Sequence, residues 1–212
     1  MTYAYTLMDS PVGQLKLVAR GDRLAAVLWE NDKPNRVRLG TMVEANERPV
    51  LLDTARQLHE YFAGERQTFD LALDFEGTAF QKKVWAALLT IPFGQTRSYS
   101  EIARQIGNLN AVRAVGAANG RNPISIVAPC HRVIGASGEL TGFAGGLANK
   151  MLLLSLEAGQ ASLQTAAESP GLAAQPLEKA NAQAKVAPTS GRSAKAERAE
   201  SMRGTQISLF GN

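Results

Sequence analysis

The first thirty residues alternate between apolar stretches and turn residues. Residues 2–8, 15–19 and 24–29 are rich in aromatic, β-branched and leucine side chains. They are separated by Ser-Pro-Val-Gly at residues 10–13 and by Gly21-Asp22, both typical of tight turns. Short apolar runs bounded by turns are typical of strands. The pattern therefore predicts a small antiparallel sheet.

Helical spacing follows the predicted sheet. Pro49 stands where a helix could begin, and Gly64 stands where a left-handed cap could end it. The apolar positions between them recur at intervals of three and four residues, which predicts one amphipathic helix. These positions are Leu51, Leu52, Ala55, Leu58, Tyr61 and Phe62.

Another helix marks the beginning of a second domain near residue 77. Its apolar face consists of Phe80, Val84, Trp85, Leu88 and Leu89. Thr78 and Gln81 have the spacing of a capping box, in which each side chain bonds the backbone N–H of the other residue. Pro92 and Gly94 would end the helix.

Two short helices with a glycine turn between them follow. Ser98 and Glu101 have capping-box spacing and begin a helix that Gly107 can end. Asn110 is expected to cap a second helix over residues 111–119. This is the sequence form of a helix-turn-helix. Helical hairpins of this length also occur in bundles, so both interpretations stay open.

The second helix of this pair consists almost entirely of small residues around one large cation, Arg113. Small side chains let a helix approach a partner closely, whether the partner is another helix or a groove of DNA. Arg113 would then point into the partner. The small residues are Ala114, Gly116, Ala117 and Ala118.

Positive charge is concentrated in the middle of the chain. The 212 residues contain 23 Lys and Arg against 19 Asp and Glu, a formal net charge of +4. Between residues 97 and 150, six cations face only two carboxylates, and five of the six are arginine. An excess of this size fits a solvated surface and phosphate contact equally well.

The composition excludes several classes of protein. A single cysteine, Cys130, cannot form an intramolecular disulfide, and no group of Cys and His has the spacing of a metal site. The N-terminus lacks the features of a signal peptide, so we expect a cytoplasmic protein. No run approaches the roughly 18 apolar residues of a membrane-spanning helix, so we expect no membrane partner.

The composition changes after Gly159. Residues 160–205 contain no aromatic residue, and prolines and glycines interrupt every long helical window. This stretch is predicted to be a disordered linker. Beyond it, Gln-Ile-Ser-Leu-Phe at residues 206–210 forms an apolar cluster. An exposed apolar cluster at the end of a linker indicates a binding peptide.

Cys130 lies in the sequence Ile-Val-Ala-Pro-Cys-His-Arg-Val. By itself, a single cysteine among apolar neighbours is most often a small buried hydrophobic residue. Its neighbours favour a nucleophile, because Pro129 fixes the approach of the backbone and His131 follows directly. Arg132 adds positive potential that would stabilise a thiolate. The residues alone leave both interpretations open.

Several motifs surround this cysteine in a fixed order: FQKKVW, IPFGQTRSYSEIA, RAVGAANGRNP, PCHRVIG, LTGFAGGL and LLSLE. They resemble the O6-alkylguanine-DNA alkyltransferases, also called methylated-DNA–protein-cysteine methyltransferases, over about residues 1–159. The resemblance implies an α/β (α+β) fold. A ribonuclease-H-like sheet-and-helix subdomain would span residues 1–76, and a helical, winged-helix-like catalytic domain with a helix-turn-helix would span residues 77–159.

The resemblance also implies the chemistry. Cys130 would take the alkyl group from O6 of guanine in one displacement and keep it as a thioether, so that each molecule acts once. His131, linked to the thiol through water, would act as the base, and Glu157 would orient it. Tyr99 would donate a proton near the purine, and Asn122 would brace the active-site loop. No cofactor and no metal are implied.

The implied partner is double-stranded DNA that contains O6-alkylguanine, bound by a monomer. Because O6 lies at the Watson–Crick edge inside the duplex, the nucleotide must leave the stack, and Arg113 would fill the gap. The helix-turn-helix would approach the minor groove. Its contact residues would be Arg113, Ala114, Gly116, Ala117, Ala118 and Arg121.

The tail peptide has a resemblance of its own. It is similar to the pentapeptide by which bacterial DNA-repair and replication proteins bind the sliding clamp. Gln206 would occupy a first pocket, and Leu209 and Phe210 an apolar pocket. The linker would let the catalytic part search DNA beside the clamp.

The sequence departs from the family pattern at two places. Phe143 and Ala144 stand where some members have tyrosine and serine, and Ser125 stands where some have proline. The preference among methyl and bulkier groups, action on O4-alkylthymine and the fate of the alkylated protein therefore stay open.

Three alternatives stand beside the repair enzyme. The first is a non-catalytic relative that binds alkylated bases, but such proteins replace the acceptor cysteine. The second is a transcription regulator built on the helix-turn-helix, which would prefer one operator sequence. The third is a cysteine hydrolase, which would turn over repeatedly.

Overall fold

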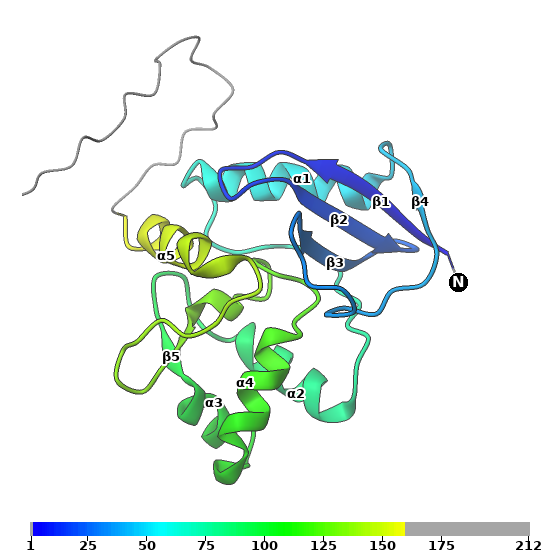
Figure 1. The fold of residues 1–212 in the computed structure, drawn as a ribbon. Coiled ribbons are helices and arrows are strands. Elements are labelled where there is room, and N and C mark those ends of the chain that lie inside the picture. The colour runs from blue at the N-terminus through cyan, green and yellow to red at the C-terminus, as the bar shows by residue number, and fades with distance from the viewer. Residues whose placement is uncertain (1, 160–212) are drawn as a thin grey trace, which may run out of the picture. The chain divides into compact units, whose positions relative to one another are not determined.

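The computed structural model describes residues 2–159, in which a sheet covered by a helix stands beside a group of helices (Figure 1). The predicted linker over residues 160–205 and the predicted binding peptide over residues 206–210 lie outside the described residues. The mixed α/β architecture, with the sheet in the first half and the helices in the second, confirms the expected fold class.

Four strands form the sheet of the first half. β1 (Tyr3–Met8), β2 (Leu15–Arg20) and β3 (Arg23–Trp29) pair antiparallel in chain order, as predicted. β4 (Met42–Glu44) pairs in parallel with β1, which gives the order β3-β2-β1-β4. The sheet is therefore mixed, because β4, which was not among the three predicted strands, adds a parallel pair at this edge. Three residues are too few to show alternation, so the sequence pattern did not reveal β4.

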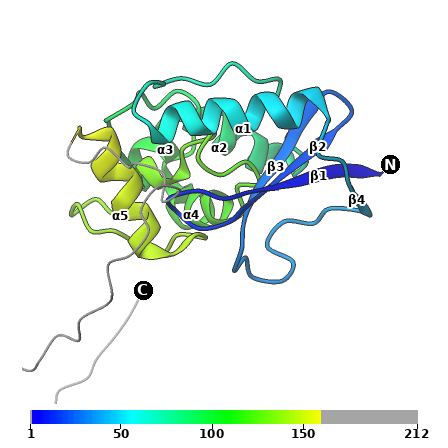
Figure 2. The same cartoon turned by 90° about the horizontal axis from the view of Figure 1, so that it is seen from above.

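Helix α1 (Pro49–Phe62) covers one face of this sheet (Figure 2). The helix begins at Pro49, and Gly64 beyond its end has a φ of +79°, as the capping pattern predicted. Leu58 faces the sheet and is fully buried, whereas Leu52 is 55% exposed. The inclusion of Leu52 in the apolar face is therefore wrong, because its position lies about 100° around the helix from Leu51.

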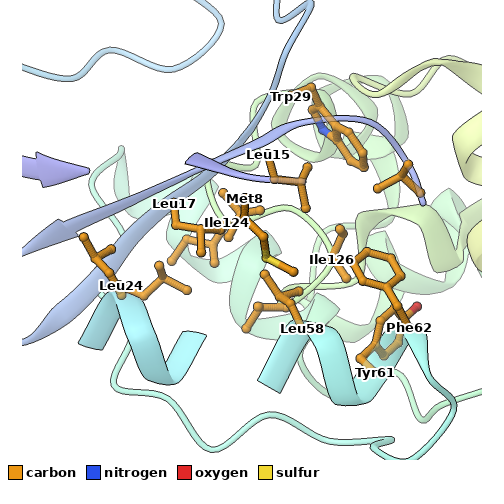
Figure 3. Close-up of a cluster of buried hydrophobic side chains, with 14 of the residues drawn as sticks. Met8, Leu15, Leu17, Leu24, Trp29, Leu58, Tyr61, Phe62, Ile124 and Ile126 are labelled. Carbon is orange, nitrogen blue, oxygen red and sulfur yellow. The ribbon is translucent and has the colours of Figure 1, made fainter. Parts of the chain in front are cut away.

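The core between sheet and helix also takes in residues from the second half of the chain. Ile124 and Ile126 pack among the buried side chains of the sheet and of α1 (Figure 3). The backbone is joined as well, since the N–H of Val27 in β3 donates to the carbonyl of Pro123 at 2.9 Å. The segment that precedes Cys130 is thus built into the core of the first half.

The second half consists of short helices and one pair of two-residue strands. Both predicted capping boxes are present, Thr78 with Gln81 and Ser98 with Glu101. The elements are α2 (Ala79–Leu88), β5 (Arg97–Ser98), α3 (Tyr99–Gln105), α4 (Val112–Gly120), β6 (Val133–Ile134) and α5 (Gly146–Glu157).

Two details predicted for these helices are wrong. Asn110 does not cap α4, because it lies inside a 3-10 turn, Leu109–Ala111, and Ala111 is the N-cap. Leu89 is the C-cap of α2 and is exposed. The helix pair itself is confirmed, with α3 packed on α4. None of the helices within residues 2–159 is long and apolar enough to cross a membrane.

Candidate active site

A strained loop connects α4 to Cys130. Ile126 has a φ of +71°, which is rare for a β-branched residue. The N–H of Val127 donates to the carbonyl of Ser125 at 2.8 Å and closes a γ-turn around Ile126. The positive-φ form of this turn is strained. Strain of this kind persists only where the surrounding structure holds it, and it is common at functional sites.

The side chain of Asn122 holds this loop. It is fully buried, and its amide nitrogen donates to the carbonyl of Ala128 at 2.8 Å. Its side-chain oxygen accepts the N–H of Ile124 at 3.1 Å. The backbone carbonyl of Asn122 accepts a hydrogen bond from Arg36 at 2.6 Å. Asn122 therefore ties the beginning of the loop both to its end and to the first half of the chain.

Cys130 lies at the start of a 3-10 turn, Cys130–Arg132, and is only 2% exposed. It packs in a cluster with apolar residues of α2, α3 and α4. Burial raises the pKa of the Cys130 thiol, and the smaller effects of the Asn122 amide and of the charges on Arg36 and Lys150 oppose this. The resting side chain is therefore a thiol, and the expectation of a thiolate stabilised by its neighbours is wrong.

The partners of Arg132 explain this difference. Its Nε and Nη2 donate to the two carboxylate oxygens of Glu157 at 2.8 and 2.9 Å. Its Nη1 donates to the carbonyl of Ile91 at 2.6 Å. The charge of Arg132 is thus matched by a buried carboxylate, which leaves little of its potential for Cys130.

His131 is fully buried next to the cysteine, with Nε2 2.7 Å from Oε1 of Glu157. A carboxylate only accepts hydrogen bonds, so Nε2 carries the proton and Nδ1 keeps its lone pair. Among the residues that the structure describes, Nδ1 has no partner. Burial lowers the pKa of His131, although Glu157 acts in the opposite direction. The imidazole is therefore neutral and can accept a proton at Nδ1.

Glu157 ends α5 and anchors this imidazole. Besides His131 and Arg132, the hydroxyl of Tyr61 donates to its Oε1 at 2.7 Å, and the N–H of Gly94 donates to its Oε2 at 3.3 Å. Burial raises the pKa of Glu157, but the hydrogen bonds from His131 and Arg132 outweigh burial and lower it to about 2. The carboxylate is ionised throughout the physiological pH range.

Sequence reasoning missed two members of this group, Tyr61 and Arg132. Tyr61 fitted the apolar face of α1, and Arg132 was expected to act on the cysteine. One general rule could have identified Tyr61: a buried tyrosine hydroxyl needs a hydrogen-bond partner. The partner itself lies 96 residues away along the chain, so no local pattern names it.

Trp29 at the end of β3 contacts two loops of the second half. Its Nε1 donates to the hydroxyl of Ser125 at 3.1 Å. Its ring packs edge-on against Phe143, with the ring centroids 5.4 Å apart. Phe143 in turn lies beside His131, with a centroid distance of 6.5 Å. Trp29 therefore connects the strained loop with the loop that borders the imidazole.

The predicted DNA-contact residues lie mostly on an exposed face of α4 and at its end. Arg113, Ala114, Ala117 and Arg121 are exposed. Ala118 is 3% exposed and packs in the same cluster as Cys130, so the expectation that its side chain contacts DNA is wrong. Ala118 lies about 100° around the helix from exposed Ala117 and three residues after buried Val115, so it shares the inward side of α4 with Val115.

Tyr99 stands in the first turn of α3, next to this face. A Cβ added at Gly116 of α4 would lie 3.8 Å from the Tyr99 ring. The hydroxyl of Tyr99 shares a hydrogen bond of 2.8 Å with the hydroxyl of Thr141. Tyr99 is partly buried, and the hydrogen bond of its hydroxyl to Thr141 is exposed to solvent. A small residue at position 116 thus leaves room for this ring.

Known proteins resemble this chain along residues 3–159. Residues 79–159 match the DNA-binding domain of 6-O-methylguanine DNA methyltransferase, and residues 3–75 match its ribonuclease-like domain. The methylated-DNA–protein-cysteine methyltransferase of Mycobacterium bovis is 50% identical over 159 residues, which are 74% of this chain and 93% of the relative. The constitutive methyltransferase of Bacillus subtilis is 46% identical over 155 residues, 72% of this chain and 94% of the relative.

A solved structure resembles the whole described part. The crystal structure of Mycobacterium tuberculosis OGT in complex with DNA has a TM-score of 0.68 and a sequence identity of 48%. The match covers 76% of this chain and 95% of that chain. The structure of the same organism's O6-methylguanine methyltransferase gives a TM-score of 0.66 at 50% identity, covering 75% and 94% of the two chains.

Proposed function

The chain belongs to the 6-O-methylguanine DNA methyltransferase family, and from this membership we propose a mechanism in which Cys130 accepts the alkyl group. The protein is a DNA-binding repair enzyme, a methylated-DNA–protein-cysteine methyltransferase. One observation carries the proposed mechanism. Glu157 holds the proton of His131 at Nε2, and Nδ1 of His131, which belongs to the same 3-10 turn as Cys130, has no hydrogen-bond partner within residues 2–159.

In the proposed reaction, Nδ1 of His131 takes the thiol proton of Cys130 through a water molecule. The sulfur then attacks the alkyl carbon of O6-alkylguanine. The S–C bond forms as the C–O6 bond breaks, and the bonding pair goes to the purine. Tyr99 gives the purine a proton, which the imidazolium replaces through solvent. Atoms and charge balance, and the chain keeps the alkyl group as a thioether, so it acts once.

The neutral resting thiol fits this mechanism. A buried thiolate would be costly in the absence of substrate, and the raised pKa of Cys130 avoids it. The pKa of His131 is lowered by burial, so the base is unprotonated when DNA arrives. Glu157, ionised and held by Arg132, stabilises the imidazolium that forms.

The lesion must leave the duplex to reach Cys130. Guanine O6 lies inside the base pair, so the nucleotide is flipped out and Arg113 takes its place in the stack. The minor groove is approached by α4, whose exposed Ala114 and Ala117 permit close contact without sequence preference. Arg121 binds the phosphate backbone. O4-alkylthymine carries the same alkyl–oxygen bond on an exocyclic position and is a second substrate under this proposal.

Intact-mass analysis tests the acceptor. Wild type and Cys130→Ala are each mixed with duplex DNA that contains O6-methylguanine, and protein mass and restored guanine are recorded. The wild type is expected to gain one methyl group for each guanine restored, and Cys130→Ala neither gains mass nor repairs. Equal behaviour of the two proteins, or repair with an unchanged wild-type mass, would refute the assignment. A transcription regulator would neither gain a methyl group nor restore guanine.

The two histidines of the chain give a matched pair for the base. His131 is fully buried at the site, and His59 is exposed on α1. His131→Asn is expected to slow single-turnover transfer by about 10²- to 10⁴-fold, the usual contribution of a general base. His59→Asn should leave the rate constant unchanged. Equal rates for both variants would remove His131 from the mechanism.

The tail adds a second part to the proposal. In this part, Gln206, Leu209 and Phe210 bind the bacterial sliding clamp. A random-coil chain with the length of residues 160–205, 46 residues, would span roughly 35–40 Å. The catalytic part then samples DNA near the clamp at raised effective concentration. A peptide of the last twelve residues, and the same peptide with these three residues changed to Ala, are titrated against the clamp. Failure of the native peptide to bind at high micromolar concentration would refute the proposal that the tail binds the clamp.

The organisation that accompanies this proposal has four parts. Residues 1–76 support the site, residues 77–159 bind DNA and carry the reaction, residues 160–205 link, and residues 206–210 bind the clamp. The protein acts as a monomer in the cytoplasm, at the nucleoid. Sedimentation of the protein with lesion DNA checks the stoichiometry, and one chain per lesion is expected.

A further inference from the structure

Tyr61 reaches the proposed catalytic group from the other half of the protein. It lies in the last turn of α1, and its side chain is fully buried. Its ring is packed among those of Phe62, Phe69 and Phe93, with centroids 5.4, 5.5 and 6.2 Å away. The stick view places Tyr61 and Phe62 together at the edge of the core beside Ile126 (Figure 3). The phenol is thus fixed in position by aromatic packing.

The Tyr61 hydroxyl shares its acceptor with the imidazole. Oε1 of Glu157 accepts from Tyr61 at 2.7 Å, from His131 Nε2 at 2.7 Å and from Arg132 Nη2 at 2.9 Å. Burial raises the pKa of the Tyr61 hydroxyl well above its ordinary range, so the group stays protonated and donates. Three donors compete for the electron density of one oxygen. A donor that is removed leaves more of that density for the other two.

We propose that Tyr61 is a positioning residue of the active site, which restrains the charge on Glu157 and thereby sets the pH range over which His131 is the neutral base. This inference rests on the proposed function, in which His131 takes the thiol proton. The hydroxyl also fixes the plane of the carboxylate together with Arg132. The first half of the chain would thus take part in the chemistry through one hydrogen bond.

The direction of the effect follows from the charges around His131. Burial lowers the pKa of His131, Glu157 raises it, and the positive charges of Arg132 and Lys150 lower it. Arg132 belongs to the same turn, Glu157 and Lys150 to α5, and Cys130 is adjacent as a neutral thiol. Tyr61 draws electron density from Glu157, the carboxylate that favours the imidazolium. Its removal should therefore make His131 easier to protonate.

Histidine NMR measures this directly. The chain has two histidines, so protein labelled in histidine gives two titrating ring signals, and exposed His59 serves as the internal reference. In Tyr61→Phe the titration midpoint of His131 is expected to move upward by about half a pH unit to one unit, a part of what a hydrogen bond to a charged group contributes. An unchanged midpoint would overturn the proposal.

Tyr3 provides a matched control. It is also a buried tyrosine of the first half, and its hydroxyl donates to a glutamate, Glu76, at the same distance of 2.7 Å. Tyr3→Phe removes a tyrosine–glutamate hydrogen bond away from His131, one whose acceptor Glu76 is exposed, and should leave the midpoint where it is. A shift of equal size in both variants would mean that the effect is a general loosening of the fold, and would overturn the proposal.

The transfer reaction gives a second readout. The acid limb of the single-turnover rate against pH should move with the NMR midpoint in Tyr61→Phe. The rate constant on the high-pH plateau should stay within about threefold of wild type, because Arg132 still orients Glu157 through two hydrogen bonds. The NMR titration needs no DNA. Absence of methyl transfer by wild type would refute the proposed function, whereas an unmoved midpoint refutes only the role of Tyr61.

Fluorinated tyrosine tests the same bond with the opposite sign. A ring fluorine makes the phenol a stronger donor, so 3-fluorotyrosine at all four tyrosines should lower the His131 midpoint. The downward shift must persist in fluorinated Tyr3→Phe protein. This measurement decides the question should Tyr61→Phe fail to fold, and an unmoved midpoint in the fluorinated protein would again overturn the proposal.

Discussion

Replacement of Glu157 by Gln tests how much of the stability depends on the buried carboxylate. The side chain is isosteric, but it removes the charge that faces Arg132 and His131. Arg132 is 5% exposed and would lose the opposing negative charge and one of its two hydrogen bonds, because a glutamine side chain has a single acceptor oxygen. A buried cation left without its partner typically costs about 3–5 kcal/mol. We therefore expect Glu157→Gln to lose unfolding free energy of that order at pH 7.

The pKa of Glu157 gives an independent magnitude. It is lowered from an ordinary 4.5 to about 2 in the folded chain. At about 1.4 kcal/mol per unit, this difference corresponds to about 3 kcal/mol. The folded value is the lower one, so the stabilisation is fully present above about pH 4.5 and is lost as the pH falls toward 2. The Gln variant lacks this carboxyl and should show a shallower loss across the same range.

Urea unfolding from pH 8 down to pH 3 measures both quantities. Trp29 and Trp85 are the two tryptophans of the chain and both are buried, so fluorescence follows the transition. Glu60 is the control, because Arg56 and Arg66 bind it at 2.5 and 2.6 Å on the surface. Glu60→Gln should cost much less than Glu157→Gln, because exposed ion pairs contribute little to stability. Equal free energies for both variants, or the wild-type pH slope in Glu157→Gln, would refute the reasoning.

Three further predictions follow from contacts around the cysteine. Trp29→Phe and Ser125→Ala each remove one end of a buried hydrogen bond, so each should lower the free energy of unfolding by about 1–3 kcal/mol. A double-mutant cycle by urea unfolding should give a coupling of about 1 kcal/mol, and additive losses would contradict a direct bond. Gly145→Ala should destabilise the protein by more than about 1 kcal/mol, because its Cβ would lie 2.6 Å from the Trp29 ring. In Gly142→Ala, a control in the same loop, the Cβ meets no atom within 4 Å and the stability should not change. Similar melting temperatures for the two variants would contradict this prediction. Because burial raises the pKa of Cys130, iodoacetamide should modify it at pH 7 at least about tenfold more slowly than in the urea-unfolded chain, with the rate rising with pH; equal rates would show an accessible thiolate.

Features decided within a few residues were predictable from the sequence. Thr78 bonds Gln81 and Ser98 bonds Glu101 three positions along the chain, so the capping boxes could be recognised without the fold. The pairing of β1 with β2 and of β2 with β3 needed only the short turns between them. The order of motifs around Cys130 was enough to suggest the family, since the comparisons give the same family.

Features decided by distant partners were not predictable. The charge on Arg132 was assigned to the neighbouring cysteine, but Glu157, 25 residues away, takes it. Burial of Cys130 depends on three helices, so its raised pKa could not follow from its neighbours in sequence. Asparagine is a common N-cap residue, but Asn110 lies inside the 3-10 turn that precedes α4. The sequence shows composition and spacing, whereas these outcomes depend on packing.

The hydrogen bonds from Arg36 to Asn122 and from Trp29 to Ser125 have a consequence for engineering. The two halves of this protein are not interchangeable parts. A chimera that joins the first 75 residues of a relative to residues 79–159 of this chain must supply side chains equivalent to Arg36, Trp29 and Tyr61. Without them the loop before Cys130 would keep the hydrogen bonds of the Asn122 side chain but lose its hydrogen bonds from the side chains of the first half. Directed evolution of new alkyl specificity should therefore randomise β3 and α1 together with the loops around Cys130.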